Sequence, residues 1–142
     1  MRRVTILFLS GLSAAVANAQ VLTLADVKGK GAAQLSAEDL KQLMPGAKVV
    51  SRTDAGSTRR WENKADGTFV ASSDNVGGSG RSRPSSGNGT WRVADDGTYC
   101  VDIQWNMSPE KWCRHIFKAS DKYYGVGKLE DSAPAREFEF SK

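Results

Sequence analysis

Apolar and polar residues alternate along most of the chain after Gly46, a pattern typical of strands with one buried face. The clearest case is 98–105, in which every second side chain from Tyr99 to Trp105 is apolar. Turn signals such as Asp66-Gly67 separate these runs at hairpin spacing. The pattern predicts eight strands, over residues 48–53, 57–63, 68–72, 89–94, 98–105, 112–118, 123–127 and 136–140.

Two of the predicted hairpins share a repeated motif. Residues 61–69 (WENKADGTF) match residues 91–99 (WRVADDGTY) at an offset of 30, and 116–124 is a degraded third copy. Each copy places an aromatic residue on either side of an Asp-containing turn. Because consecutive hairpins favour a meander, we expect a mainly β fold of eight antiparallel strands. It should form a small barrel or a strongly twisted open sheet.

One short helix is predicted before the sheet. Ser36 followed by Asp39 is a variant of the capping box, so the helix should run over 37–44. Residues 20–34 have an apolar start followed by KGKGAA, which is typical of a loosely held arm. Residues 35–142 are therefore expected to form a single β-rich domain.

The first 19 residues are typical of a secretory signal peptide. Arg2 and Arg3 precede an apolar stretch over 4–16, and Ala17-Asn18-Ala19 matches an A-x-A cleavage site. The apolar run is shorter than the roughly 20 residues that span a bilayer. We therefore predict cleavage after Ala19, export to the periplasm or the extracellular space, and no transmembrane segment in the mature chain.

Composition excludes several classes of function. A chain of 142 residues allows a single domain. One histidine and two cysteines exclude a zinc finger, a multi-histidine metal site and a haem-attachment motif, so no metal or cofactor is predicted. The net charge of +4 falls to +2 when Arg2 and Arg3 leave with the signal peptide. Such a weak charge, on an exported protein, also argues against nucleic acid as a partner.

The two cysteines indicate a disulfide. In an oxidising compartment Cys100 and Cys113 most simply pair with each other. Their spacing matches neither C-x-x-C nor a familiar zinc pattern. If the two cysteines face each other across a hairpin, Asp102 lies opposite Lys111.

A different strand register would bring together a carboxylate and an imidazole. A hairpin symmetric about Ser108-Pro109 places Asp102 opposite His115, as in a hydrolase. However, no serine lies in a G-x-S-x-G nucleophile elbow. The sequence leaves both registers open, predicts no catalytic residue, and makes a hydrolase the least favoured function.

Residues 77–90 contain five glycines, four serines and no apolar side chain, which predicts a mobile loop or an extended edge hairpin. Its arginines, Arg81 and Arg83, are candidate contacts for an anionic partner, and Arg59 and Arg60 extend that basic patch. The partner would be an anionic envelope component, such as lipid phosphate or acidic polysaccharide, or another envelope protein.

Four motifs resemble a known family. They are GTWRV (89–93), DGTYCV (96–101), WCR (112–114) and DKYY (121–124). They resemble the pattern of a family of small exported proteobacterial proteins that carries only a domain-of-unknown-function label. The resemblance covers roughly 35–140 and implies a helix before the sheet, paired cysteines and a periplasmic location. It implies no activity and no functional residues.

A second resemblance is to lipocalin-like barrels, in which a G-x-W element closes one barrel end beneath an apolar ligand. Gly89-Thr90-Trp91 matches this element but lies in mid-chain instead of on the first strand. An internal ligand would contact inward positions such as Trp91, Tyr99 and Val101. The sequence thus predicts a non-enzymatic exported binding module, with a small apolar-ligand carrier as the alternative.

Overall fold

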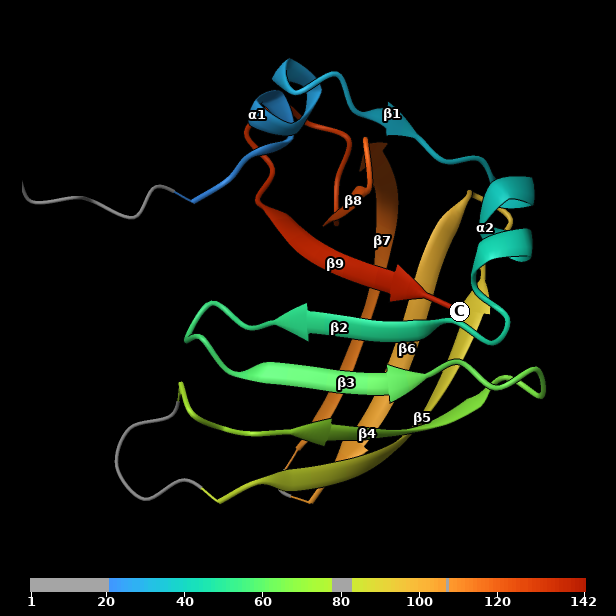
Figure 1. Cartoon of the computed structure of the whole chain (residues 1–142), viewed down its shortest axis with the longest axis vertical. Coiled ribbons are helices and arrows are strands. Elements are labelled where there is room, and N and C mark those ends of the chain that lie inside the picture. The colour runs from blue at the N-terminus through green and yellow to red at the C-terminus, as the bar shows by residue number, and fades with distance from the viewer. Residues whose placement is uncertain (1–20, 78–82, 107) are drawn as a thin grey trace, which may run out of the picture.

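The computed structural model describes residues 21–77, 83–106 and 108–142 (Figure 1). The predicted signal peptide and Arg81 lie outside these residues. The elements are α1 (Leu24–Gly29), β1 (Ala33–Gln34), α2 (Ala37–Leu43), β2 (Lys48–Arg52), β3 (Thr58–Glu62), β4 (Thr68–Ser73), β5 (Ser85–Val93), β6 (Thr98–Trp105), β7 (Pro109–Ala119), β8 (Lys122–Val126) and β9 (Ala135–Ser141).

Strands β2 to β9 form an antiparallel meander that closes into a barrel. Each strand pairs with the next in the chain, and β9 returns to pair with β2, where Phe140 lies opposite Val49. The short β1 pairs with the edge of β7 that faces away from β8, with Ala33 opposite Lys118. The eight predicted strands and the predicted barrel are confirmed, although β5 and β7 begin earlier than predicted, at Ser85 and Pro109.

Aromatic and aliphatic side chains from alternate strand positions fill much of the barrel. The largest are Trp61, Phe69, Tyr99, Phe138 and Phe140, all 9% exposed or less. Leu40 and Met44, from α2 and its C-terminus, join the same cluster. Helix α2 therefore covers one end of the barrel (Figure 1).

Helix α2 begins as its sequence predicts. Ser36 accepts a hydrogen bond from the Asp39 amide, and the Asp39 carboxylate accepts one from the Ser36 amide. These two bonds satisfy donors that the first helical turn would otherwise leave free.

The segment before α2 is more ordered than the loosely held arm expected over 20–34. Leu24 and Val27 of α1 are fully buried against Phe117, Tyr124 and Val126 on the outer wall of the barrel. A second capping box, formed by Thr23 and Asp26, starts this helix. The apolar residues at the start of this segment pack on a surface that forms only when β7 and β8 pair, so the sequence of the segment alone did not indicate its burial.

The repeated motif builds the same turn twice. Asp66 accepts hydrogen bonds from the amide and hydroxyl groups of Thr68, and Asp96 does the same for Thr98. Gly67 and Gly97 have φ values of 85° and 81°, a left-handed conformation that glycine adopts without a Cβ clash. Both turns lie at the barrel end that α2 covers.

The glycine-rich segment is partly a strand. β5 begins at Ser85, and Ser85–Thr90 pairs with β4. Of the two expectations for 77–90, the extended hairpin is the one found over 85–90, and residues 89 and 90 also belong to the strand predicted over 89–94. The ladder with β4 supplies the backbone hydrogen bonds that these small side chains cannot replace. Within the described residues, no helix is long and apolar enough to cross a membrane.

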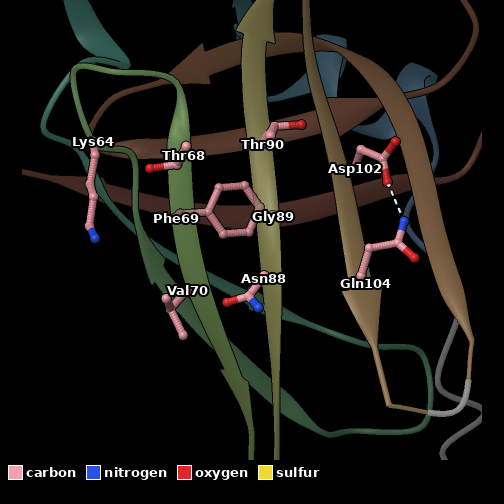
Figure 2. A pocket seen from close by; sticks show the side chains of 9 residues that line it. All are labelled: Lys64, Thr68, Phe69, Val70, Asn88, Gly89, Thr90, Asp102 and Gln104. Carbon is pink, nitrogen blue, oxygen red and sulfur yellow. Dashed lines mark hydrogen bonds between the residues drawn. The ribbon is translucent and has the colours of Figure 1, made fainter.

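Gly89 of this strand leaves space for a core side chain. The ring of Phe69 lies beside Gly89 (Figure 2), and a Cβ at residue 89 would lie 2.3 Å from two of its ring atoms. We expect Gly89→Ala to lower the free energy of unfolding by about 1–3 kcal/mol, because the core must shift to admit the methyl group. Urea denaturation measures this change.

Gly29→Ala is the matched control. A Cβ at this last residue of α1 meets nothing within 4 Å, so we expect no loss of stability or a gain of about 0.4–1 kcal/mol. Equal stabilities for the two variants would contradict the role given to Gly89.

Candidate functional site

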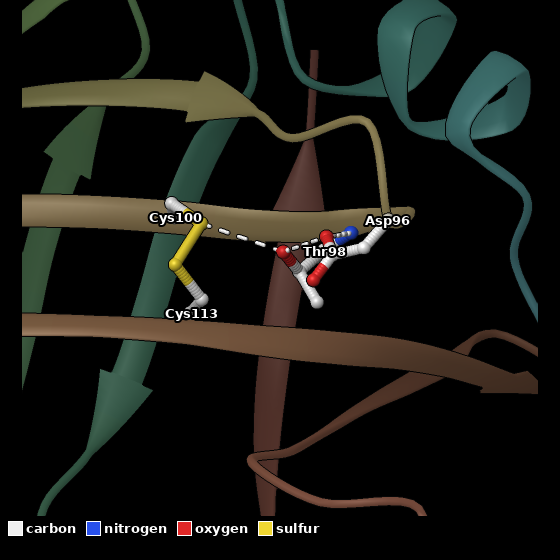
Figure 3. The surroundings of a disulfide bond; sticks show 4 residues. All are labelled: Asp96, Thr98, Cys100 and Cys113. Atoms are coloured by element: carbon white, nitrogen blue, oxygen red, sulfur yellow. Dashed lines mark hydrogen bonds between the residues drawn. A yellow bond between two sulfur atoms is a disulfide. The ribbon is translucent and has the colours of Figure 1, made fainter.

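The disulfide settles the register of the hairpin formed by β6 and β7. Cys100 and Cys113 are bonded, and their Cα atoms are 4.0 Å apart on directly opposite positions (Figure 3). The predicted disulfide is confirmed. Nearby, the Thr98 hydroxyl lies 3.4 Å from the Cys100 sulfur and also donates to Asp96.

This register separates the proposed hydrolase pair. Asp102 lies opposite Lys111, and His115 lies opposite Thr98. The prediction that pairs Asp102 with His115 is wrong, because the disulfide shifts the pairing away from a hairpin symmetric about the Ser108-Pro109 loop. His115 instead contacts Gln34 of β1, with 3.3 Å between Nδ1 and the amide nitrogen.

The three candidate contacts for an internal ligand belong to the barrel core or pack against it. Tyr99 and Val101 are 0% and 2% exposed. Trp91 is half-buried, packs against the core and donates its indole N–H to the Lys64 carbonyl at 2.8 Å. This end of the barrel, beneath α2, is filled by protein side chains.

The opposite end of the barrel holds an open cavity, which we call the mouth cavity. Its volume is about 530 Å³, and it lies between the loop joining β2 to β3 and the segments flanking residues 78–82. Hydroxyl, amide and guanidinium groups dominate its lining, which is formed by Thr53, Ala55, Ser57, Arg59, Ser73, Asn75 and Arg83.

Hydrogen bonds hold the walls of the mouth cavity together. The Gly77 amide donates to the Ser57 hydroxyl at 3.0 Å, which joins the segment after β4 to the start of β3. The Asn75 side chain donates to the Arg83 carbonyl and to the Ser85 hydroxyl, at 2.6 and 3.0 Å. These contacts connect the two sides of the segment before β5.

Arg59 is the charged group that reaches from the mouth cavity into the barrel. It lies two positions before the buried Trp61 and shares its inward direction. Its Nη1 forms an ion pair with Glu110 of β7, and its guanidinium carbon lies 5.1 Å from the centre of the Trp105 ring. Its Nε atom is buried and has no hydrogen-bond partner within 21–77, 83–106 and 108–142.

Two further arginines lie on inward positions of the barrel. Arg114 of β7 stacks on Trp112, with its guanidinium carbon 4.8 Å from the ring centre. Arg136 of β9 donates to Asp54 at 3.3 Å. Burial, and to a smaller extent the charge of Arg136, lower the pKa of Arg114 to about 10, while Glu110 and Asp54 act in the opposite direction.

The four arginines predicted to contact an anionic partner do not form one patch. Arg59 and Arg83 both line the mouth cavity. Arg60 projects to the other side of β3, because neighbouring strand residues face opposite ways, and it is exposed. Arg81 lies outside the described residues. The inward contribution of Glu110, Arg114 and Arg136 was missed by the sequence analysis.

A second hollow lies on the outer wall. It has a volume of about 530 Å³ over β4, β5 and β6 (Figure 2). Asp102, the residue of the rejected hydrolase pair, lies here and accepts a hydrogen bond from Gln104 at 3.0 Å. Its other lining residues are Lys64, Thr68, Phe69, Val70, Asn88, Gly89 and Thr90.

A family model described as "Protein of unknown function (DUF995)" matches residues 7–115, which is more than half of the chain. The chain belongs to this family. The predicted membership of a family with a domain-of-unknown-function label is thereby confirmed. Neither the curated proteins nor the solved structures gave a match to the chain.

The DUF995 match contains most of the candidate site. Arg59, Arg83 and Glu110 lie within it, whereas Arg136 lies beyond its end at residue 115. It starts and ends earlier than the span of 35–140 over which the motifs resemble a family. Among the described residues of this DUF995 protein, no group of three or more His, Cys, Asp or Glu side chains could hold a metal ion.

Proposed function

We propose that this protein is an exported, non-catalytic binding module and that its ligand is a small molecule held in the mouth cavity. The observation that carries the proposal is the cavity itself. Its volume of about 530 Å³ lies within the roughly 300–1,000 Å³ of small-molecule sites. Inside the barrel, the end beneath α2 is filled by side chains, so an internal ligand would lie at the opposite end.

The position of Arg59 favours a small ligand over an extended anionic surface. A lipid surface or a polysaccharide would be met by arginines that point outward together. Arg59 instead turns into the barrel, away from the exposed Arg60. A molecule must therefore enter the mouth to reach its guanidinium group.

A binding role is favoured over catalysis by the strand register. The sequence has one histidine, His115, and the residue opposite it is Thr98. Asp102, its proposed acid partner, lies four residues further along the same strand as Thr98. The charged residues of the mouth cavity are arginines, whose planar sets of N–H donors are suited to binding an acceptor. Export is supported by the leader-like residues 1–19 and by the disulfide, which is typical of oxidising compartments.

The proposal is tested by nuclear magnetic resonance on the isotopically labelled protein. We would titrate three sets of small aromatic compounds, one neutral, one anionic and one cationic, and map the shifted amide signals. The expected result is that at least one set shifts the amide signals of Ser57, Arg59, Ser73 and Asn75 together.

Export is tested separately. Intact-mass analysis of protein from its source cells should show a chain that begins at Gln20.

Ala55→Trp should abolish these shifts, because Ala55 is exposed and an indole there would fill the mouth cavity. The matched control is Ala65→Trp, which adds the same side chain to an exposed turn at the other barrel end. No shift in the mouth cavity with any of the three sets would overturn the proposal. Shifts confined to the outer hollow would do so as well.

A further inference from the structure

The inner wall of the barrel carries more positive than negative charge. Arg59, Arg114 and Arg136 occupy inward positions of β3, β7 and β9, whereas Glu110 is the one carboxylate on an inward position of the described strands. Including the rim residues Arg83 and Asp54, four positive charges face two negative ones. Inward charges are costly unless they are paired, and Arg59 and Arg136 are paired with Glu110 and Asp54. Arg114, which stacks on Trp112, is the inward arginine without an ion pair among the described residues.

Two N–H donors on this wall have no acceptor among the residues that the structure describes. They are Nε of Arg59, whose side chain is 21% exposed, and the indole Nε1 of Trp105. A buried donor without a partner costs about 1–3 kcal/mol. Both belong to residues that contact each other, since the Arg59 guanidinium lies over the Trp105 ring. Of these two residues Arg59 lines the mouth cavity, so its guanidinium group is the one within reach of an acceptor that enters there.

The ion pair between Arg59 and Glu110 indicates what kind of acceptor fits. Glu110 presents a carboxylate to Nη1 of Arg59 and accepts a hydrogen bond from Trp112 through its other oxygen, at 3.2 Å. A guanidinium group has five N–H donors arranged as a planar fork, so the contact of Nη1 with Glu110 leaves further N–H donors of Arg59 for a second carboxylate. The contact with Glu110 thus shows that the Arg59 guanidinium group accommodates a carboxylate in this position.

We propose that the mouth cavity binds a small organic carboxylate, with Arg59 as its main charged contact and Glu110 as an internal competitor for the same guanidinium. This inference rests on the proposed function, because it names the chemical class of the ligand for that site. It places the anionic group inside the barrel and gives Arg83 only a secondary part at the rim.

The test compares benzoate with benzamide, which has nearly the same shape but no charge. We expect benzoate to bind at least about ten-fold more tightly, because charge-assisted hydrogen bonds are roughly twice as strong as neutral ones. Dissociation constants come from the shifts of the Arg59 and Ser73 amides. Phenyl phosphate is the third probe and distinguishes a carboxylate site from a phosphate site.

Two variants should change the affinity for benzoate in opposite directions. Arg59→Met keeps the aliphatic stem and should remove the preference for benzoate over benzamide. Glu110→Gln removes the competing charge but keeps an acceptor for Trp112, so it should tighten benzoate binding several-fold. Arg60→Met is the matched control, because it removes a neighbouring charge from the outer face and should leave the preference intact. Thermal denaturation verifies that each variant is folded.

Several outcomes would overturn this inference. Equal affinities for benzoate and benzamide would reject the carboxylate and leave the proposed function standing. Tighter binding of phenyl phosphate would assign the site to phosphate instead. Weaker benzoate binding by folded Glu110→Gln would contradict the competition. If the neutral, anionic and cationic sets all fail to shift the mouth cavity, the proposed function fails with it.

Discussion

Replacing Tyr99 with alanine is expected to lower the free energy of unfolding by about 3–5 kcal/mol, the range for truncating a fully buried aromatic side chain. Tyr99 is completely buried, and its ring packs edge-on against Trp112 and Phe140, with centroids 5.8 and 5.9 Å apart. These contacts join β6, β7 and β9 across the barrel. Urea denaturation monitored by circular dichroism measures the loss.

The hydroxyl group of Tyr99 makes a second contribution to the free energy of unfolding, which can be measured separately from that of the ring. It accepts a hydrogen bond from the Trp61 indole at 3.1 Å and donates one to the Asn63 side chain at 2.8 Å. Burial raises the pKa of Tyr99, which keeps this hydroxyl protonated. Tyr99→Phe preserves the ring and should cost about 1–3 kcal/mol, because Asn63 is fully buried and loses a donor.

Tyr123→Phe is the matched control for the hydroxyl group. Tyr123 is only half-buried and packs on the same Phe140 ring, with centroids 5.1 Å apart. Its substitution should change stability by less than Tyr99→Phe does. If Tyr99→Phe proved as stable as the unaltered protein, the buried trio of Trp61, Asn63 and Tyr99 would not contribute to stability as argued.

Loss of the disulfide is expected to lower the free energy of unfolding by about 3 kcal/mol, the chain-entropy value for a loop of this order of length. The bond links Cys100 to Cys113 across a sequence separation of 13 residues. The variant that carries both Cys100→Ala and Cys113→Ser removes it. Chemical denaturation of this variant and of the unaltered protein, both without reductant, measures the change.

Reduction supplies an independent control. The reduced protein should approach the stability of the double variant, and benzoate binding should stay unchanged, because Cys100 and Cys113 lie on the outer wall and outside the lining of the mouth cavity. Thiol alkylation before and after reduction follows the bond directly. Two reactive thiols in protein purified without reductant would show that the bond does not form.

The charged inner wall was partly readable from the sequence. Each inward arginine lies two positions from an inward aromatic residue: Arg59 from Trp61, Arg114 from Trp112 and Arg136 from Phe138. Strand alternation alone places each pair on one face. However, sequence proximity favoured Arg60 as the companion of Arg59, although neighbouring strand residues face opposite ways. If the alternation of strand positions is applied to charged as well as apolar residues, it predicts that these three arginines point inward.

The register of the hairpin formed by β6 and β7 required more than local pattern. Two pairings were compatible with the alternation, since they differ by an even number of residues and keep the same side chains inward. The disulfide between Cys100 and Cys113 selects one of them and thereby separates Asp102 from His115. The register of this hairpin was therefore decided by a covalent bond between the strands and not by the alternation of apolar and polar residues.

Local signals in the sequence determined the strands, the turns at Gly67 and Gly97, and the capped start of α2, because each depends on residues within one turn or one strand. Tertiary structure alone decided that the meander closes between β2 and β9 and that α1 is buried on the outer wall. It also decided that Arg59 meets Glu110, 51 residues away. These features depend on how far each strand is shifted against the next around the barrel, and that shift arises from the packing of all eight strands together.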